Sequence, residues 1–139
     1  MDGVSPVCLR DCRVAMADRP EPLEELDDYF ASATVAHEYA AGIHLRLVEL
    51  DADDEHSQEL LSESAAVVLK EMPRLARELR SLEREWGEQE LLDPAQAERT
   101  AQALRARWAE VAPELAPLRA RQDEIVAELA QLAGRASRG

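Results

Sequence analysis

Residues 104–132 read LRARWAEVAPELAPLRARQDEIVAELAQL, and this stretch decides the fold. Large apolar residues recur in alternating steps of three and four, which is typical of a helix that packs along one side. Pro113 and Pro117 lie inside the pattern, and each interior proline costs about 3 kcal/mol. The apolar spacing keeps its phase across both prolines, and burying each large apolar side chain contributes about 1.5–3 kcal/mol. We therefore expect one continuous, bent helix; the alternative is a break near Pro113–Pro117 that yields a four-helix bundle.

The same alternation extends beyond this stretch in both directions, and we expect the helix to cover residues 94–133. Asp93 is a favourable N-cap, Pro94 suits the first helical position, and Gly134 is a natural stop. Residues 135–139 then form a short C-terminal tail. The expected core-facing positions are Ala97, Ala101, Leu104, Trp108, Val111, Leu115, Leu118, Gln122, Ile125, Leu129 and Leu132.

Two further helices are expected before this one, after a flexible tail of residues 1–19. Residues 22–50 carry an apolar residue every three or four positions, and acidic residues crowd the first turns, where the helix dipole favours negative charge. Residues 55–91 carry a second heptad pattern, which we expect to run without a slip. The expected core positions are Leu26, Phe30, Ala33, Ala36, Ala40, Ile43, Leu47 and Leu50, then Leu61, Ala65, Val68, Met72, Leu75, Leu79, Leu82 and Trp86.

The sequence thus predicts an all-α fold, an elongated three-helix antiparallel bundle of the coiled-coil type, in a single helical domain of residues 20–134. A hydrophobic content of 46% supports a core, while 4% aromatic residues and five glycines disfavour a β-sandwich or barrel. The short turn after residue 91 makes the last two helices antiparallel neighbours. Their charges predict a contact of Glu78 with Arg107. They also predict a contact of Glu83 with Arg105.

Gln122 is a polar residue within an otherwise apolar pattern. The antiparallel register places it near Leu61 of the preceding helix. Two interpretations stay open at this point. A lone buried polar residue can fix register or oligomeric state at a cost in stability, or the side chain can reach the rim of the bundle and solvate its amide.

The chain is strongly acidic, with 29 acidic and 16 basic residues and a formal net charge of -13. Residues 20–56 alone hold eleven acidic residues and one arginine. Direct nucleic-acid binding and anionic membrane surfaces are disfavoured, because both need a basic face. We see no signal peptide and no apolar run of about 18 residues that could span a membrane, so we expect a cytoplasmic location. Arg-over-Lys and Ala-rich usage favours a bacterial source.

Metal and cofactor sites are not expected. Cys8 and Cys12 form one C-x3-C pair, whereas a structural zinc site usually needs two such pairs, so we interpret them as incidental thiols. His37 and His44 share one helix face, but seven residues separate them by about 10 Å, too far for one metal ion. We expect these histidines, and His56, to be packed or rim residues. A metal site shared across a dimer and a pH switch are the alternatives.

Two acidic patterns resemble functional motifs without matching them. Residues 51–55 read DADDE, as in a calcium-binding loop, but His56 replaces the required glycine and Ser62 replaces the bidentate glutamate. The pairs Glu25/Asp28 and Glu85/Glu88 have the E-x-x-D/E spacing with which all-helical nucleotide pyrophosphohydrolases hold Mg²⁺ on facing helices. Such pairs arise by chance in a chain with 29 acidic residues, so we expect no enzyme and keep the Mg²⁺-dependent hydrolase as an alternative.

The expected function is a non-catalytic helical protein–protein interaction module: an adaptor, a chaperone-like protein or a regulatory coiled-coil protein. The first helix is short and Ala-rich, so we expect it to leave part of the apolar seam exposed for a homodimer or another helical partner. The expected partner-binding residues are Gln122, Ile125, Leu129 and Leu132. A second hypothesis is an acidic decoy, which competes with nucleic acid for a basic protein surface. Salt weakens a decoy complex far more than a seam complex.

Overall fold

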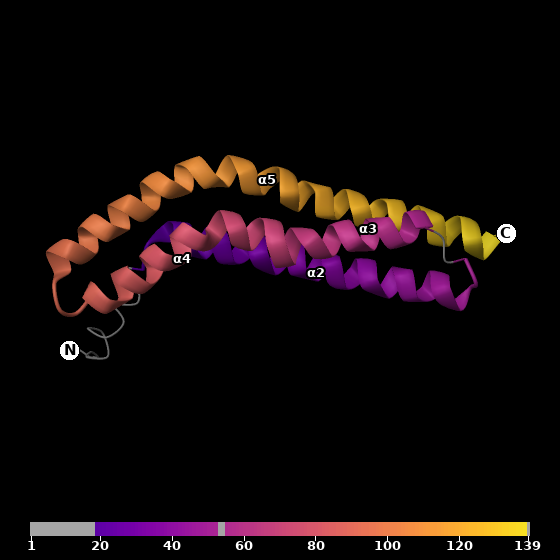
Figure 1. Cartoon of the computed structure of the whole chain (residues 1–139), viewed down its shortest axis with the longest axis horizontal. Coiled ribbons are helices and arrows are strands. Elements are labelled where there is room, and N and C mark those ends of the chain that lie inside the picture. The colour runs from indigo at the N-terminus through magenta and orange to yellow at the C-terminus, as the bar shows by residue number, and fades with distance from the viewer. Residues whose placement is uncertain (1–18, 53–54, 139) are drawn as a thin grey trace, which may run out of the picture. The chain divides into compact units, whose positions relative to one another are not determined.

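The computed structural model describes residues 19–52 and 55–138, and every regular element in these ranges is helical (Figure 1). The elements are α2 (Glu21–Glu49), α3 (Glu55–Ala66), η1 (Val67–Glu71), α4 (Met72–Gln89) and α5 (Pro94–Arg138). A π-helical segment, η1, joins the α-helices α3 and α4 without a break, so these three elements form one run. The chain therefore forms three helical segments, and the fold is the expected all-α three-helix bundle.

The longest helix, α5, is continuous across Pro113 and Pro117, as predicted. Both prolines are exposed, so their rings lie away from the packed side of the helix. The alternative of a break that yields four helices is wrong. The helix also continues past Gly134, because Ala136 still packs against the hydrophobic core. The expected C-terminal tail is therefore helical over all its described residues.

The run from α3 through η1 to α4 does not keep the uninterrupted heptad that the sequence predicts. In η1 the backbone N–H of Met72 donates to the carbonyl of Val67, five residues back, so one extra residue is accommodated in a wider turn. Before η1 the buried positions lie one residue ahead of the expected Leu61, Ala65 and Val68, which are only half-buried. The buried positions of the run are Ser57, Leu60, Ser64, Val67, Met72, Ala76 and Leu79.

Helix α2 ends in a compact cap. Asp51 has a φ of 57°, in the left-handed region. Its N–H donates to the carbonyl of Val48 at 3.0 Å, and the N–H of Ala52 donates to the carbonyl of Leu47 at 2.8 Å. These two bonds form a Schellman motif, which satisfies carbonyls that the helix end leaves free. The motif turns the chain back toward α3.

Contacts within the chain divide it into two compact units. The hairpin unit comprises residues 19–25 and 78–109, and the bundle unit comprises residues 26–52, 55–77 and 110–138. Each unit has its own set of buried side chains. Within the described ranges, no helix is long and apolar enough to cross a bilayer.

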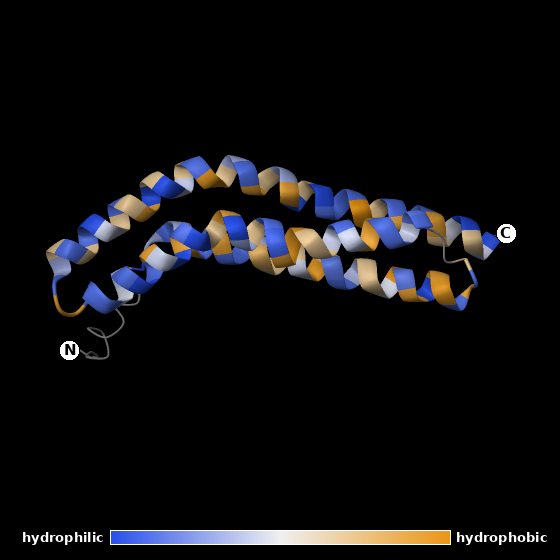
Figure 2. Ribbon diagram, in the orientation of Figure 1, coloured by the Kyte–Doolittle hydropathy of each residue, from blue (hydrophilic) through white to orange (hydrophobic). Residues whose placement is uncertain are grey.

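In the hairpin unit, the end of α4 returns into the start of α5. Asp93 caps α5 as predicted, because its Oδ1 accepts a hydrogen bond from the N–H of Gln96 at 3.2 Å. Arg107 pairs with Glu78 at 3.3 Å, which confirms the predicted register. The turn exposes Leu91 and Leu92, which give it the orange colour in Figure 2.

The second predicted contact of this hairpin is wrong. Glu83 pairs with Arg19 at 3.1 Å and with Arg80 at 3.2 Å. Arg105 instead pairs with Glu98 at 3.6 Å, which lies about two turns earlier on the same helix, α5. Nearer partners on the same helix and in the preceding segment therefore replace the cross-helix pair.

In the bundle unit, α2 and α3 form an antiparallel hairpin, and the C-terminal half of α5 lies beside both (Figure 1). The core of this unit is contributed by all three helices. Alanines on α2 let the helices approach closely, and larger side chains from α3 and α5 fill the centre. The fully packed residues are Ala40, Leu47, Leu60, Ile125 and Leu129.

Candidate interaction surface

The residues predicted to bind a partner lie mostly inside the bundle unit. Ile125 and Leu129 have no exposed surface and Gln122 is 1% exposed, while Leu132 is half-buried against the same core. The expectation that this part of the seam is uncovered is wrong, because α2 reaches far enough for Leu47 to pack on it. As partner contacts, the three buried residues could act only if the bundle opened.

Gln122 on α5 bridges to both of the other helices of the bundle unit by hydrogen bonds. Its Nε2 donates to the carbonyl of Ala33 on α2 at 3.1 Å and to the carbonyl of Ser64 on α3 at 3.4 Å. Its Oε1 is buried and accepts no hydrogen bond from the described residues. The side chain is therefore in the interior and sets register, and the interpretation as a solvated rim residue is wrong.

The histidines of α2 pair with serines of α3. His37 Nδ1 lies 2.9 Å from the hydroxyl of Ser64, and His44 Nδ1 lies 2.9 Å from the hydroxyl of Ser57. His56 lies on α3 and faces the carboxylate of Glu128 at 3.3 Å. They are packed or rim residues, as expected. In the part of the chain that the structure describes, no three His, Cys, Asp or Glu side chains gather as metal ligands would.

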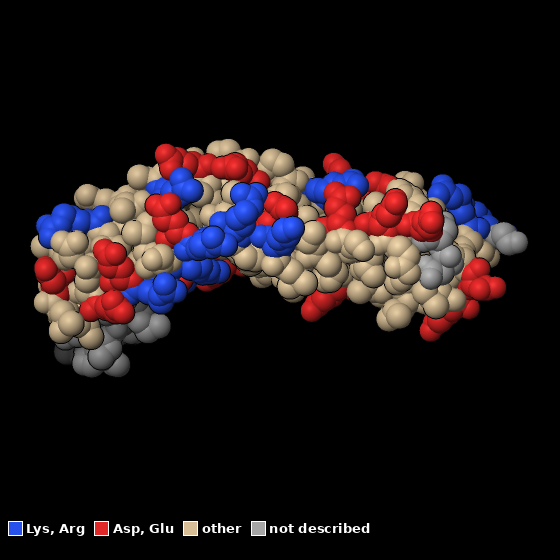
Figure 3. Space-filling view, viewed as in Figure 1, with Lys and Arg blue, Asp and Glu red and all other residues tan. Residues whose placement is uncertain are grey.

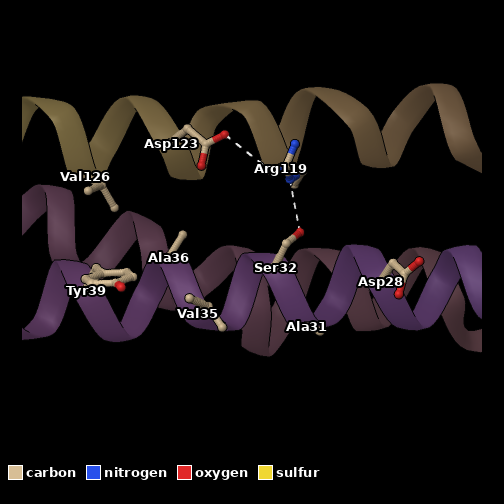
Figure 4. A pocket seen from close by; sticks show the side chains of 9 residues that line it. All are labelled: Asp28, Ala31, Ser32, Val35, Ala36, Tyr39, Arg119, Asp123 and Val126. Atoms are coloured by element: carbon tan, nitrogen blue, oxygen red, sulfur yellow. Dashed lines mark hydrogen bonds and ion pairs between the residues drawn. The ribbon is translucent and has the colours of Figure 1, made fainter.

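An open groove runs between α2 and α5 in the bundle unit (Figure 4). Val35 and Tyr39 lie on its α2 wall and are 49% and 65% exposed. Val126 projects from α5 toward the same space, and Ala36 lies between the two helices. A groove walled by a large aromatic and two branched aliphatic side chains fits the apolar face of a helix. The residues that line it are Asp28, Ala31, Ser32, Val35, Ala36, Tyr39, Arg119, Asp123 and Val126.

The polar side chains of the groove lie at its edges. Arg119 spans from α5 to α2, where its Nε donates to the hydroxyl of Ser32 at 3.0 Å. The same guanidinium lies 3.9 Å from the carboxylate of Asp123, a long ion pair (Figure 4). Asp123 is 62% exposed, so its charge remains available to a partner. Asp28 adds a second acidic side chain at the other end.

The α2 wall of the groove belongs to a longer exposed stripe along α2, on a different side of the helix from the residues that face the core. Val35, Tyr39, Gly42 and Arg46 follow one another in steps of four, three and four, and all are exposed. Apart from its chain neighbours and its own helix backbone, no described atom lies within 4 Å of the place that a Cβ would take on Gly42. This stripe was not expected from the sequence. The signal was the spacing of four residues between Val35 and Tyr39, which puts both on one face of a helix.

A network of charged side chains ties α3 to α5 on the surface of the bundle unit. Arg121 forms a two-point ion pair with Glu63, with N–O distances of 2.6 and 2.9 Å. It also contacts Glu124 at 3.2 Å and Glu128 at 3.3 Å. The hydrogen bond from Arg121 lowers the pKa of Glu63 below its ordinary value of 4.5, and the bond to Glu63 raises the pKa of Arg121. Both shifts favour the charged forms, so the network ties α3 to α5 through ion pairs.

Basic side chains gather over α4 on the face seen in Figure 3. Arg74, Arg77 and Arg84 are exposed, and their spacings of three and seven put them on one side of the helix. This row was not expected from the sequence, because the net charge of residues 57–92 is negative and hides it. Arg74 is partly neutralised by Glu71 at 3.0 Å. The expectation of no direct nucleic-acid binding stays a prediction.

The other candidate motifs lie on the surface or outside the described residues. Glu25, Asp28, Glu85 and Glu88 are all exposed, and Thr100 donates to Glu85 at 3.0 Å. Cys8, Cys12 and residues 53–54 of the acidic loop lie outside the described residues. No family model, no curated protein and no solved structure matches this chain.

Proposed function

We propose that this protein is a non-catalytic helical protein–protein interaction module that binds the apolar face of a partner helix in the groove between α2 and α5. The observation that carries the proposal is the pair Val35 and Tyr39. Both are largely exposed on the wall of an open groove, although the core beneath them is closed. Large aromatic side chains at such positions are typical anchors of protein interfaces.

The groove also favours a particular kind of helix. Its apolar wall calls for apolar side chains at spacings of three and four. The carboxylates of Asp123 and Asp28 at its edges favour a basic residue beside that apolar face. The open space over Gly42, next to Tyr39, has room for a side chain of the partner. The proposed ligand is thus an amphipathic helix with an apolar stripe and at least one flanking arginine or lysine.

The proposed surface differs from the exposed seam that the sequence predicts, but the predicted class of function is the same.

An acidic decoy would differ from this interaction module in one measurable respect, the salt dependence of its complex. A decoy is held by charge and dissociates as salt rises, since the Debye length falls to about 3 Å at 1 M salt. A complex that rests on Val35 and Tyr39 keeps most of its affinity under the same conditions.

Photo-crosslinking in cells that produce the protein tests the proposal. A photoreactive aromatic amino acid replaces Tyr39 in one version and Ala127, exposed on α5 and outside the groove lining, in the control. The expected result is a discrete adduct from position 39, joined to an amphipathic helical segment and absent from position 127. No adduct from position 39, or the same adducts from both positions, would contradict the proposal.

A further inference from the structure

We propose that the helix which occupies the groove is α2 of a second copy of this chain, packed antiparallel to the first. This inference rests on the proposed function and names its partner. The pairing places Tyr39 of each copy opposite Gly42 of the other, about a two-fold axis level with Ala40 and Ala41. Closed two-fold dimers are the commonest assemblies of soluble proteins, and they require a surface that is complementary to itself.

The shape of the α2 stripe meets this requirement. Tyr39 is the most exposed large hydrophobic side chain of the stripe at 65%, and the space over Gly42, three residues later, is open. In an antiparallel pair of identical helices, the projecting side chain of each copy lies opposite the opening of the other, so the same contact forms twice. The ring of Tyr39 therefore has a place to go in both halves of the dimer.

The charges of the stripe agree with the same register. Arg46 is the one Lys or Arg of α2; it is exposed and forms no ion pair with the described residues. With Tyr39 opposite Gly42, Arg46 of the second copy falls opposite Val35, where Asp123 lines the groove. Each copy thus supplies the basic residue that the acidic edge of the other favours.

Within one copy these two charges cannot meet. Arg46 follows Val35 by eleven residues, which is roughly 16 Å along the helix axis. An effect that couples Arg46 to Asp123 must therefore act between copies, and this makes charge reversal a specific test.

Sedimentation equilibrium of the full chain over a roughly 100-fold range of concentration measures the association. The wild-type chain is expected to dimerise. Gly42→Leu fills the opening and is expected to weaken dimerisation at least about tenfold. The matched control is Gly87→Leu, at a second exposed helical glycine that also has open space above it, and it is expected to leave dimerisation unchanged. Circular dichroism checks that both variants fold, and leucine favours helix at both sites.

Charge reversal supplies the second arm of the test. Arg46→Asp alone and Asp123→Arg alone are expected to weaken the dimer, and the double variant is expected to recover it. A wild-type chain that stays monomeric, equal effects of the two glycine variants, or a double variant no better than the single ones would each overturn the inference.

The two proposals fail in distinguishable ways. A monomeric chain that still gives a discrete adduct with a different protein from position 39 would overturn the second copy as partner and leave the interaction module standing. A monomeric chain with no adduct from position 39 would overturn both. A dimer of the purified chain, with an adduct between two copies in cells, supports both.

Discussion

The Nδ1 atom of His44 lies 2.9 Å from the hydroxyl of Ser57 inside the bundle unit, and the contact recurs one heptad away between His37 and Ser64. The two histidines are seven residues apart on α2, and the two serines are seven residues apart on α3. The hairpin register is therefore fixed twice by the same pair of residue types. A slip of one residue would break both bonds at once.

The two histidine–serine pairs should differ in how much they contribute to the stability of the fold. Ser57→Ala leaves the ring nitrogen of buried His44 without its partner, and we expect this to lower the free energy of unfolding by about 1–3 kcal/mol. Ser64→Ala removes the partner of His37, which is half-buried and can bond to water instead. We therefore expect a smaller loss in the free energy of unfolding, about 0.5–1.5 kcal/mol. Urea denaturation measures both. Equal losses, or no loss in either variant, would contradict the role assigned to these bonds.

Replacing Gln122 should separate stability from specificity. Gln122→Leu removes a buried Oε1 that accepts no hydrogen bond from the described residues. The glutamine and leucine side chains have similar volumes. The carbonyls of Ala33 and Ser64 lie within α2 and α3, and a carbonyl inside a helix accepts a main-chain hydrogen bond. We expect the free energy of unfolding to stay level or rise by about 1 kcal/mol. Urea denaturation measures this free energy. If it fell by more than about 1 kcal/mol, the amide would be shown to stabilise the fold, against this prediction.

The ion pair of Glu63 and Arg121 makes a pH-dependent contribution. The pKa of Glu63 is lowered in the folded chain, so the contribution is fully present above its ordinary value of 4.5 and is lost as pH falls through the folded value. Because both side chains are partly exposed, at 46% and 33%, the gain is only about 0.5–1 kcal/mol. Thermal unfolding of wild type and Arg121→Met should therefore differ most near neutral pH. A difference that grows toward acid pH would reverse the sign and refute the assignment.

The π-helical segment should behave as a removable insertion. Deleting Leu69, which is 76% exposed, closes the five-residue step between Val67 and Met72 to four and restores the phase of an α-helix. We combine it with Pro73→Ala, because an ordinary helical turn tolerates an interior proline poorly. Thermal unfolding followed by circular dichroism should show a cooperative fold, whereas deleting Ser62 should lower the stability much further, because it moves Ala65 and Val68 into the buried places of Ser64 and Val67. Loss of folding in both deletions would contradict this account of η1.

The α5 helix could be predicted from the sequence because its apolar residues keep one phase over its whole length. Val111, Leu115 and Leu118 bridge the two prolines, and all are buried or half-buried. The run before it could not be predicted to the same accuracy. An inserted π turn leaves no apolar signature in the sequence, so Leu61 was expected in the core where Leu60 lies.

The interaction surface was harder to predict than the fold. Whether Ile125 and Leu129 are covered depends on how far α2 extends along α5, and an alanine-rich helix gives little sign of that. The α2 stripe mixes Val35 and Tyr39 with Gly42, which weakens any periodic signal. The groove itself exists only when two helices are placed side by side, and spacing along one chain does not show it.

The most direct test of the groove as the working surface is hydroxyl-radical footprinting of Tyr39, read by mass spectrometry on the dilute and on the assembled protein. The reactivity of Tyr39 should fall several-fold on assembly, while that of Trp108, half-buried in the hairpin unit, should not change. An unchanged Tyr39 in a protein that has demonstrably assembled would place the interface elsewhere and contradict the account.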